Sequence, residues 1–152
     1  MELKATELQI EDGVGVITLN RPQRMNAWTG RMHTEYRWCL KELDDNGEVG
    51  AIVVTGKGRG FCVGGDAEAL TGHAKKGGYD PGTPREMAMP GFGVDERFDA
   101  SFAYQFGLSK PNLAAMNGPA AGVGLALDCF ADLRFPAAGA TYTKSHGELN
   151  VQ

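Results

Sequence analysis

The stretch Lys110–Arg134, KPNLAAMNGPAAGVGLALDCFADLR, predicts the fold more strongly than any other part of the chain. Its pattern indicates a short apolar strand at Asn112–Met116, then a Gly/Pro/Ala loop, then a helix that starts near Gly122. The first turn of a helix has backbone N–H groups without intrahelical acceptors and carries the positive end of the helix dipole. We therefore expect this loop to present backbone donors to a ligand.

An earlier stretch repeats this layout. An apolar strand at Gly50–Thr55 is followed by the glycine-rich loop Gly60–Asp66, GFCVGGD, and then by a short helix at Ala67–Thr71. Glycine lets a ligand or a neighbouring backbone approach closely. Two strand–loop–helix units can aim two backbone N–H groups at one point, which is the arrangement of an oxyanion hole.

Composition and charge exclude several classes of protein. The chain has 152 residues, 42% of them hydrophobic, which is enough for one domain over residues 1–152 with its own core. A net charge of −4 argues against a nucleic-acid-binding protein, which would carry a basic stripe. No apolar run approaches the length of a membrane span, so we expect no membrane partner.

The N-terminus and the cysteines predict the compartment. The first residues, MELKATELQIED, are polar and acidic, unlike a signal or transit peptide. The three cysteines are isolated from one another, so we expect no disulfide framework and a reducing, cytoplasmic location. His33 and His73 lack the spacing of metal ligands, and we expect no metal site.

The N-terminal half predicts a hairpin and a long helix. Strands are expected at Leu3–Ile10 and Val14–Leu19. From Thr29 to Asn46 apolar residues recur at helical spacing, and the charged residues between them suggest a solvated face. We expect His33 to lie on the outer face of this helix.

The second half begins with a segment dense in Gly and Pro, Gly72–Gly93, which predicts a flexible surface loop. Val94, Phe98, Phe102 and Phe106 then follow at i, i+4 spacing, typical of a helix with an apolar stripe in the core. Two short strands, Leu133–Phe135 and Ala140–Thr143, are expected near the end. The whole pattern predicts layered α/β packing.

Three segments, in this order and spacing, together resemble the crotonase (enoyl-CoA hydratase/isomerase) superfamily. They are Val14–Pro22 (VGVITLNRP) with Met25–Ala27 (MNA), Gly60–Asp66 (GFCVGGD), and Lys110–Arg134. The resemblance implies a ββα-spiral fold that binds acyl-CoA thioesters as substrates and needs no further cofactor. It also implies assembly into a homo-oligomer, a trimer or hexamer.

The resemblance assigns roles to individual residues. The thioester carbonyl would accept hydrogen bonds from the backbone N–H groups of Gly65 and Val123, which stabilise an enolate-like transition state. A backbone donor does not depend on its side chain, so valine at position 123 is compatible with this role. The coenzyme A groove would be lined by Arg24, Met25, Ala27, Val63, Asp66, Ala67, Glu68 and Gly122.

The chain departs from the hydratases at the acid and base. These enzymes use two glutamates to add water across a double bond, and the matching positions here hold Ala126 and His146. Asp128 and Glu148 each lie two residues away, and on a helix that offset turns a side chain to another face. Since imidazole titrates near neutral pH, His146 could serve as the acid or base.

The resemblance ends after Tyr142, before the C-terminal helices that close the acyl pocket and build the trimer interface in the family. We therefore expect an incomplete crotonase-like domain with an exposed edge strand and an apolar face. Three functions remain open. They are an enoyl-CoA hydratase/isomerase, a catalytically silent paralogue that only binds acyl-CoA, and another crotonase reaction such as isomerisation, dehalogenation or thioester hydrolysis.

Overall fold

The computed structural model describes residues 2–68, 71 and 102–144, and these residues form an α/β structure around one sheet. The sheet has five strands in the order β1-β2-β3-β4-β6. β1 and β2 form an antiparallel hairpin, and the other neighbours are parallel. The strands are β1 (Thr6–Glu11), β2 (Val14–Leu19), β3 (Ala51–Gly56), β4 (Asn112–Met116) and β6 (Leu133–Pro136).

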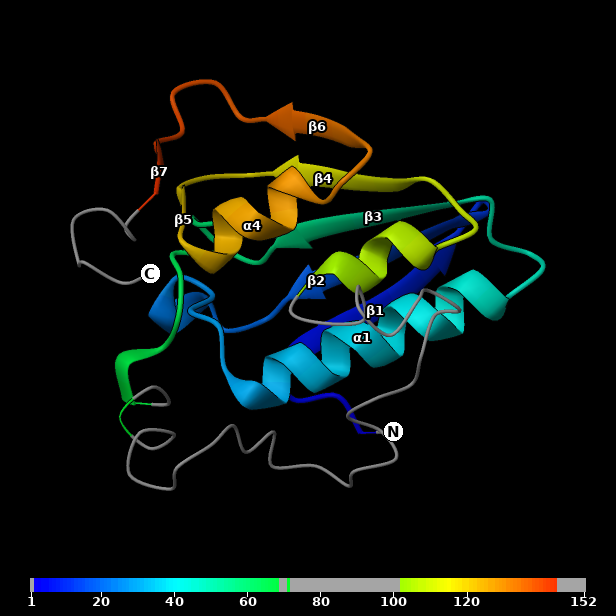
Figure 1. Cartoon of the computed structure of the whole chain (residues 1–152), viewed down its shortest axis with the longest axis horizontal. Helices are drawn as coiled ribbons and strands as arrows, with labels where there is room; N and C mark the ends of the chain where they lie inside the picture. Colours follow the sequence, from blue (N-terminus) through cyan, green and yellow to red (C-terminus); the bar gives the residue numbers. More distant parts are fainter. Residues whose placement is uncertain (1, 69–70, 72–101, 145–152) are drawn as a thin grey trace.

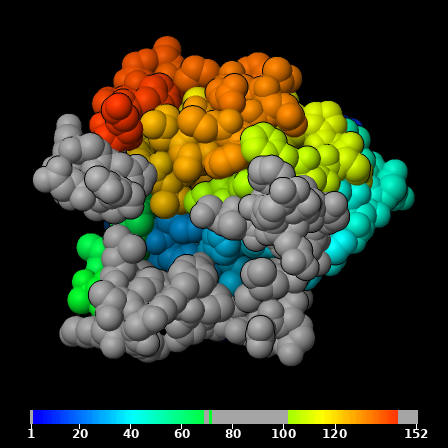
Figure 2. Space-filling view, viewed as in Figure 1, coloured from blue at the N-terminus to red at the C-terminus, as the bar shows by residue number. Residues whose placement is uncertain are grey.

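The helices α1 (Gly30–Asp45) and α4 (Val123–Cys129) lie on the same face of this sheet (Figure 1). Short 3-10 helices, η1 (Pro22–Arg24) and η2 (Ala103–Gly107), lie in the connections. A second, two-stranded sheet pairs β5 (Ala120–Ala121) with β7 (Tyr142–Thr143). In the space-filling view, α4, β6 and β7 form the orange and red upper part of the molecule (Figure 2).

Alternating side chains place the core between the sheet and the helices. Ile52 and Val54 of β3 are buried, and Val54 is in register with Ala114 of β4. Met32 and Leu40 of α1 are fully buried in the same core. This one-sided burial follows from the period of two in strands and 3.6 in helices. Because β3 and β4 are parallel, their ends, and hence the loops that follow them, lie at one edge of the sheet.

The predicted hairpin, the long helix and the strands before both glycine-rich loops are confirmed. α1 begins where expected, because the Thr29 hydroxyl accepts a hydrogen bond from the amide of Met32 at 3.1 Å and so caps the helix. β6 is one of the two edge strands of the five-stranded sheet, and its side chains Leu133 and Phe135 are 53% and 57% exposed. The expected edge strand with apolar side chains is therefore present.

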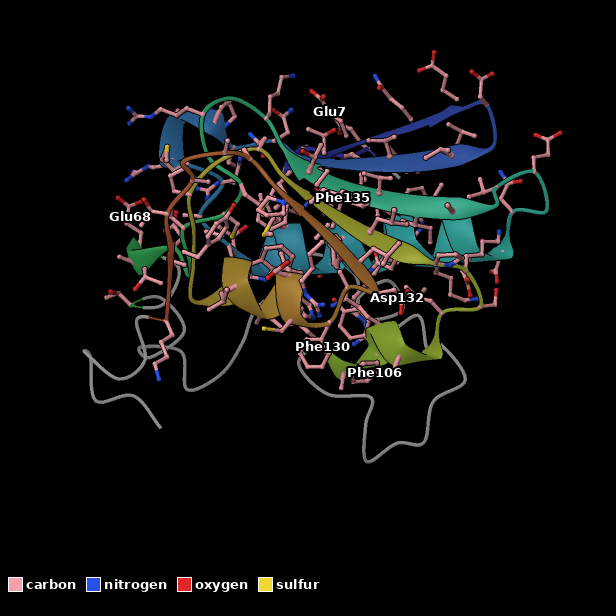
Figure 3. The ribbon with its side chains drawn as sticks, turned by 90° about the horizontal axis from the view of Figure 1, so that it is seen from above. Glu7, Glu68, Phe106, Phe130, Asp132 and Phe135 are labelled. Atoms are coloured by element: carbon pink, nitrogen blue, oxygen red, sulfur yellow. The ribbon has the colours of Figure 1, made fainter. Side chains whose placement is uncertain are left out.

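The predicted core helix through Phe106 is wrong where the structure describes it. Residues 103–107 form the 3-10 helix η2, and Phe106 is 70% exposed. Its ring packs on Phe130, with the ring centroids 5.1 Å apart, on the helix side of the sheet (Figure 3). Phe102 does pack against the core. The i, i+4 spacing predicted one continuous α-helix, whereas a 3-10 turn rotates each residue by a larger angle.

The prediction that the charged residues of α1 form a solvated face is also wrong for Glu35 and Arg37. Both side chains are buried, and the Arg37 guanidinium lies 4.2 Å from the centre of the Tyr104 ring. The Glu35 carboxylate accepts hydrogen bonds from the amides of Lys4, Ala5 and Thr6 at 2.8–3.0 Å. It also accepts one from Arg31. Glu35 thus fixes the start of β1 against α1.

His33 is not on an outer face either. Its ring lies edge-on to those of Trp28, Phe102 and Tyr104, with centroids 5.5–6.0 Å apart. Burial and the nearby Arg37 charge lower the pKa of His33 to about 4. A partly buried imidazole in an aromatic cluster looks, in sequence, like any polar residue between apolar ones.

Parts of the sequence prediction fall outside the described residues. These are the flexible loop over residues 72–93, with His73, and the segment that holds His146 and Glu148. They stay predictions. Among residues 2–68, 71 and 102–144, no helix is both long enough and apolar enough to cross a bilayer.

We predict that Glu35→Gln lowers the free energy of unfolding by about 2–3 kcal/mol, because the three amides and Arg31 lose a charged acceptor. Urea unfolding would measure this. Glu42→Gln, at an exposed position of the same helix, is the matched control and should change stability by less than about 0.5 kcal/mol. Equal effects of the two substitutions would contradict the role of Glu35.

We predict that His33 makes stability fall with acid. Since its pKa is below the usual 6.5 in the folded protein, only the unfolded chain gains its proton between pH 6.5 and about 4. Stability should therefore decrease across that window by about 1.4 kcal/mol per pH unit, and His33→Gln should remove this slope. An NMR titration in which the His33 ring protonates near pH 6.5 would show the prediction to be wrong.

Candidate active site

The first glycine-rich loop, Gly60–Asp66, is held by Trp28 on both sides of Gly65. The Trp28 amide donates to the Gly64 carbonyl at 2.7 Å, and the Asp66 amide donates to the Trp28 carbonyl at 2.8 Å. Gly65 itself is exposed, and no residue in the described part of the chain accepts a hydrogen bond from its N–H. The loop is fixed on both sides of a backbone donor that has no acceptor there.

The second loop leads into α4 and ends in a similar donor. The Ala120 amide donates to Thr141 at 3.0 Å, and the Gly122 amide donates to Thr143 at 3.3 Å, which ties the loop to β7. Gly122 has φ +49°, a conformation that favours glycine. Val123 is the first residue of α4, and within residues 2–68, 71 and 102–144 nothing accepts from its N–H.

The two loops are joined to each other directly. The Phe61 amide donates to Pro119 at 3.1 Å, and the Ala121 amide donates to Cys62 at 2.9 Å, as in a parallel bridge between Cys62 and Ala120. Gly65 and Val123 each follow this bridge by three residues, so the register brings them to the same end of it. The Gly65 and Val123 amides therefore belong to two loops that contact each other. Neither amide has an acceptor among the described residues.

Glycine makes this approach possible. A Cβ atom built on Gly124 would lie 2.0 Å from the Cys62 carbonyl oxygen. This distance is too short for any side chain, so only glycine fits at this position without a shift of the backbone. A Cβ on Gly64 would lie 3.4 Å from the Ala121 carbonyl oxygen. The first turn of α4 therefore rests on the backbone of the first loop.

Several residues of the expected coenzyme A groove also come together beside the first loop. The Val63 amide donates to the Met25 carbonyl at 3.3 Å, and Arg24 pairs with Glu68 at 3.1 Å on the surface. Val63 and Ala67 are exposed next to them. Residues from two distant parts of the sequence are thus neighbours here, and we call Arg24, Met25, Val63, Ala67 and Glu68 the surface strip.

Asp66 and Ala27 have little surface left for a ligand. Asp66 is 6% exposed, and its carboxylate pairs with Arg21 at 2.9 Å and accepts from the Glu68 amide at 3.1 Å. Arg21 also donates to the Ala27 carbonyl at 2.5 Å. Sequence reasoning missed Arg21, although its place before Pro22 in the first family motif was a usable signal.

Of the two positions at which the hydratases have a glutamate, the structure describes Ala126 but not His146. Ala126 lies half-buried on α4 and offers no ionisable group. Asp128 is buried at the end of that helix, where burial raises the pKa of its carboxyl and the Arg134 guanidinium, 3.6 Å away, lowers it, for a net rise.

Cys62 packs inside the first loop rather than serving as a nucleophile. Its thiol is fully buried, and burial raises its pKa to about 11 even though the Gly64 amide donates to the sulfur. A neutral thiol of this kind behaves as a small apolar side chain. No group of three or more His, Cys, Asp or Glu residues in the described ranges is placed to hold a metal ion.

Comparison with known proteins gives the family. The family of enoyl-CoA hydratases/isomerases matches residues 9–150, beyond the end of the resemblance noted above at Tyr142. The chain is 33% identical to 1,2-epoxyphenylacetyl-CoA isomerase of Escherichia coli K12 over 93% of its length and 51% of that protein. It is 34% identical to the probable enoyl-CoA hydratase EchA14 of Mycobacterium tuberculosis H37Rv, with 95% and 51% covered.

Solved structures agree. An enoyl-CoA hydratase/isomerase from Mycobacterium paratuberculosis superposes with a TM-score of 0.75 at 27% identity, covering 95% of this chain and 54% of that one. The chain therefore belongs to the enoyl-CoA hydratase/isomerase family and has the crotonase fold, as its sequence predicted. It spans about half the length of the curated relatives it matches.

We predict that Gly124→Ala lowers the free energy of unfolding by about 1–3 kcal/mol, because the new methyl group would push α4 away from the Cys62 carbonyl. Thermal unfolding would measure this loss. Gly47→Ala is the matched control, since a Cβ there meets nothing within 4 Å. If the two substitutions have the same effect, the close contact between the loops is not as the structure has it.

Proposed function

We propose that this chain binds acyl-CoA thioesters and polarises the thioester carbonyl with the N–H groups of Gly65 and Val123. The observation that carries the proposal is the pair of amides without an acceptor in the described structure, at the same end of the bridge that joins the two loops. Two fixed backbone donors stabilise the negative charge that develops on a carbonyl oxygen when an enolate forms. Val123 adds the positive end of a helix.

The rigidity of both loops supports this role. Each donor is followed or preceded by residues whose own backbone groups are hydrogen-bonded, so little reorganisation is needed when charge develops. The surface strip of Arg24, Met25, Val63, Ala67 and Glu68 is then the proposed coenzyme A contact. Asp66 does not contact the ligand in this proposal, and instead holds the first loop in place through its ion pair with Arg21. A cytoplasmic homo-oligomer remains the expectation for its assembly and location.

A second candidate reaction is favoured by position 126. A hydratase needs a carboxylate there, and Ala126 supplies only a methyl group. Isomerisation through an enolate uses the same oxyanion donors and needs no water to be added, and the relative from Escherichia coli is named as an isomerase. A chain that only binds acyl-CoA is the remaining alternative.

We predict that Val123→Pro weakens binding of butyryl-CoA about tenfold, while Val123→Ala leaves it unchanged. Proline removes the N–H but suits the first position of a helix, so α4 should persist. Titration calorimetry would measure both affinities. The proposal fails if wild-type protein does not bind butyryl-CoA, or if proline and alanine have the same effect.

The hydration of crotonyl-CoA separates the reactions. Loss of the enoyl absorbance would assign hydratase activity despite Ala126. Binding without hydration, combined with a shift of the double bond in 3-enoyl-CoA, would assign isomerase activity. Binding without either reaction would leave the acyl-CoA-binding role.

A further inference from the structure

Two asparagines link the loops of the proposed site without being part of it. The turn Gly56–Gly60, which leads from β3 into the first loop, lies between Asn26 and Asn117. Asn26 follows η1, and Asn117 follows β4 on the way to the second loop. The side-chain amide of each asparagine forms hydrogen bonds with backbone groups of this turn.

Asn117 holds the turn from the side of the second loop. Its Oδ1 accepts from the Gly56 amide at 3.0 Å, and its Nδ2 donates to the Gly58 carbonyl at 2.8 Å and, more weakly, to the Gly60 carbonyl at 3.4 Å. The next residue, Gly118, is so close that an added Cβ would lie 2.1 Å from the Arg59 carbonyl oxygen. The end of β4 is thus fixed on the turn.

Asn26 holds the same turn from the other side. Its Nδ2 donates to the Lys57 carbonyl at 3.1 Å and to the Gly60 carbonyl at 2.8 Å, and its Oδ1 accepts from the Arg21 amide at 2.8 Å. The side chain is fully buried, and the backbone has φ +56°, which asparagine tolerates better than most residues. Two residues later comes Trp28, which fixes Gly64 and Asp66.

We propose that Asn26 and Asn117 are positioning residues for the oxyanion pair. By holding the Gly56–Gly60 turn between them, with the Gly60 carbonyl as their common acceptor, they set the position of the Gly65 amide relative to the Val123 amide. The proposal rests on the function proposed above. Oxyanion donors must hold their places within about 0.5 Å, so a shift of one loop is enough to weaken the pair.

The test compares two ligands that differ at the carbonyl. Butyryl-CoA carries the thioester oxygen, and S-butyl-CoA, a thioether, lacks it. Asn117→Asp and Asn26→Asp keep the shape and the Oδ1 acceptor but replace the Nδ2 donor by an oxygen that faces carbonyl groups. Asn46→Asp is the control, because it adds the same charge at the end of α1 and keeps its bond from the Glu48 amide.

We expect wild-type protein and Asn46→Asp to prefer butyryl-CoA over S-butyl-CoA. In Asn117→Asp and Asn26→Asp the ratio of the affinity for butyryl-CoA to that for S-butyl-CoA should fall about tenfold, with the affinity for S-butyl-CoA nearly unchanged. If the two asparagines had a merely structural role, the substitutions would weaken the binding of both ligands to the same extent. That outcome, or an unchanged preference, would overturn the inference. A wild-type protein without any preference would instead overturn the proposed oxyanion pair itself.

A second measurement needs no ligand. In amide NMR spectra of the free protein, Asn117→Asp should shift the signals of Gly65 and Val123, neither of which its side chain contacts, and Asn46→Asp should not. Unshifted signals would overturn the inference. Asn26 is fully buried, so its substitution also tests folding. Asn117→Asp and Asn117→Ser, at an exposed residue, decide the question if the Asn26 variant does not fold.

Discussion

The structure depends on the hydrogen bonds that join its two glycine-rich loops. The Phe61 and Ala121 amides cross between the loops, and Gly124 brings the first turn of α4 onto the Cys62 carbonyl. Both loops follow parallel strands that end at one edge of the sheet, so the fold brings them together before any side chain takes part. The side chains of Arg21, Asn26 and Asn117 then hold the loops in place from outside the bridge.

This arrangement explains why the site tolerates an unusual sequence. The proposed chemistry uses main-chain donors, which valine at position 123 supplies as well as any other residue except proline. The part of the family pattern that does need a particular side chain is the pair of acids. There the chain differs, since Ala126 has no proton to give or take. In the proposed function, binding and polarisation of a thioester use neither acid, so they do not depend on a carboxylate at position 126.

Much of the fold could be predicted because it follows local rules. Strand alternation, the Thr29 cap and the glycine-rich loops each leave a pattern within a few residues. These patterns predict the five strands of the main sheet, α1 and the helix after Gly122, but not the short strand β5. Apart from the 3-10 helix η2, predicted as part of an α-helix, the errors concern burial set by distant partners. Glu35 is buried because its carboxylate accepts hydrogen bonds from the amides of Lys4, Ala5 and Thr6. His33 is partly covered by the rings of Phe102 and Tyr104. The Arg21–Asp66 pair likewise joins residues far apart in sequence.

In the proposed function two main-chain amides donate to one carbonyl oxygen, and a vibrational spectrum of the bound ligand reports this directly. Butyryl-CoA labelled with carbon-13 at the thioester carbonyl would be bound to the protein and its carbonyl stretching band compared with that of free ligand. Two donors on the oxygen lengthen the C=O bond, so we predict a band at lower frequency in the complex. A band at the frequency of butyryl-CoA in water would contradict it.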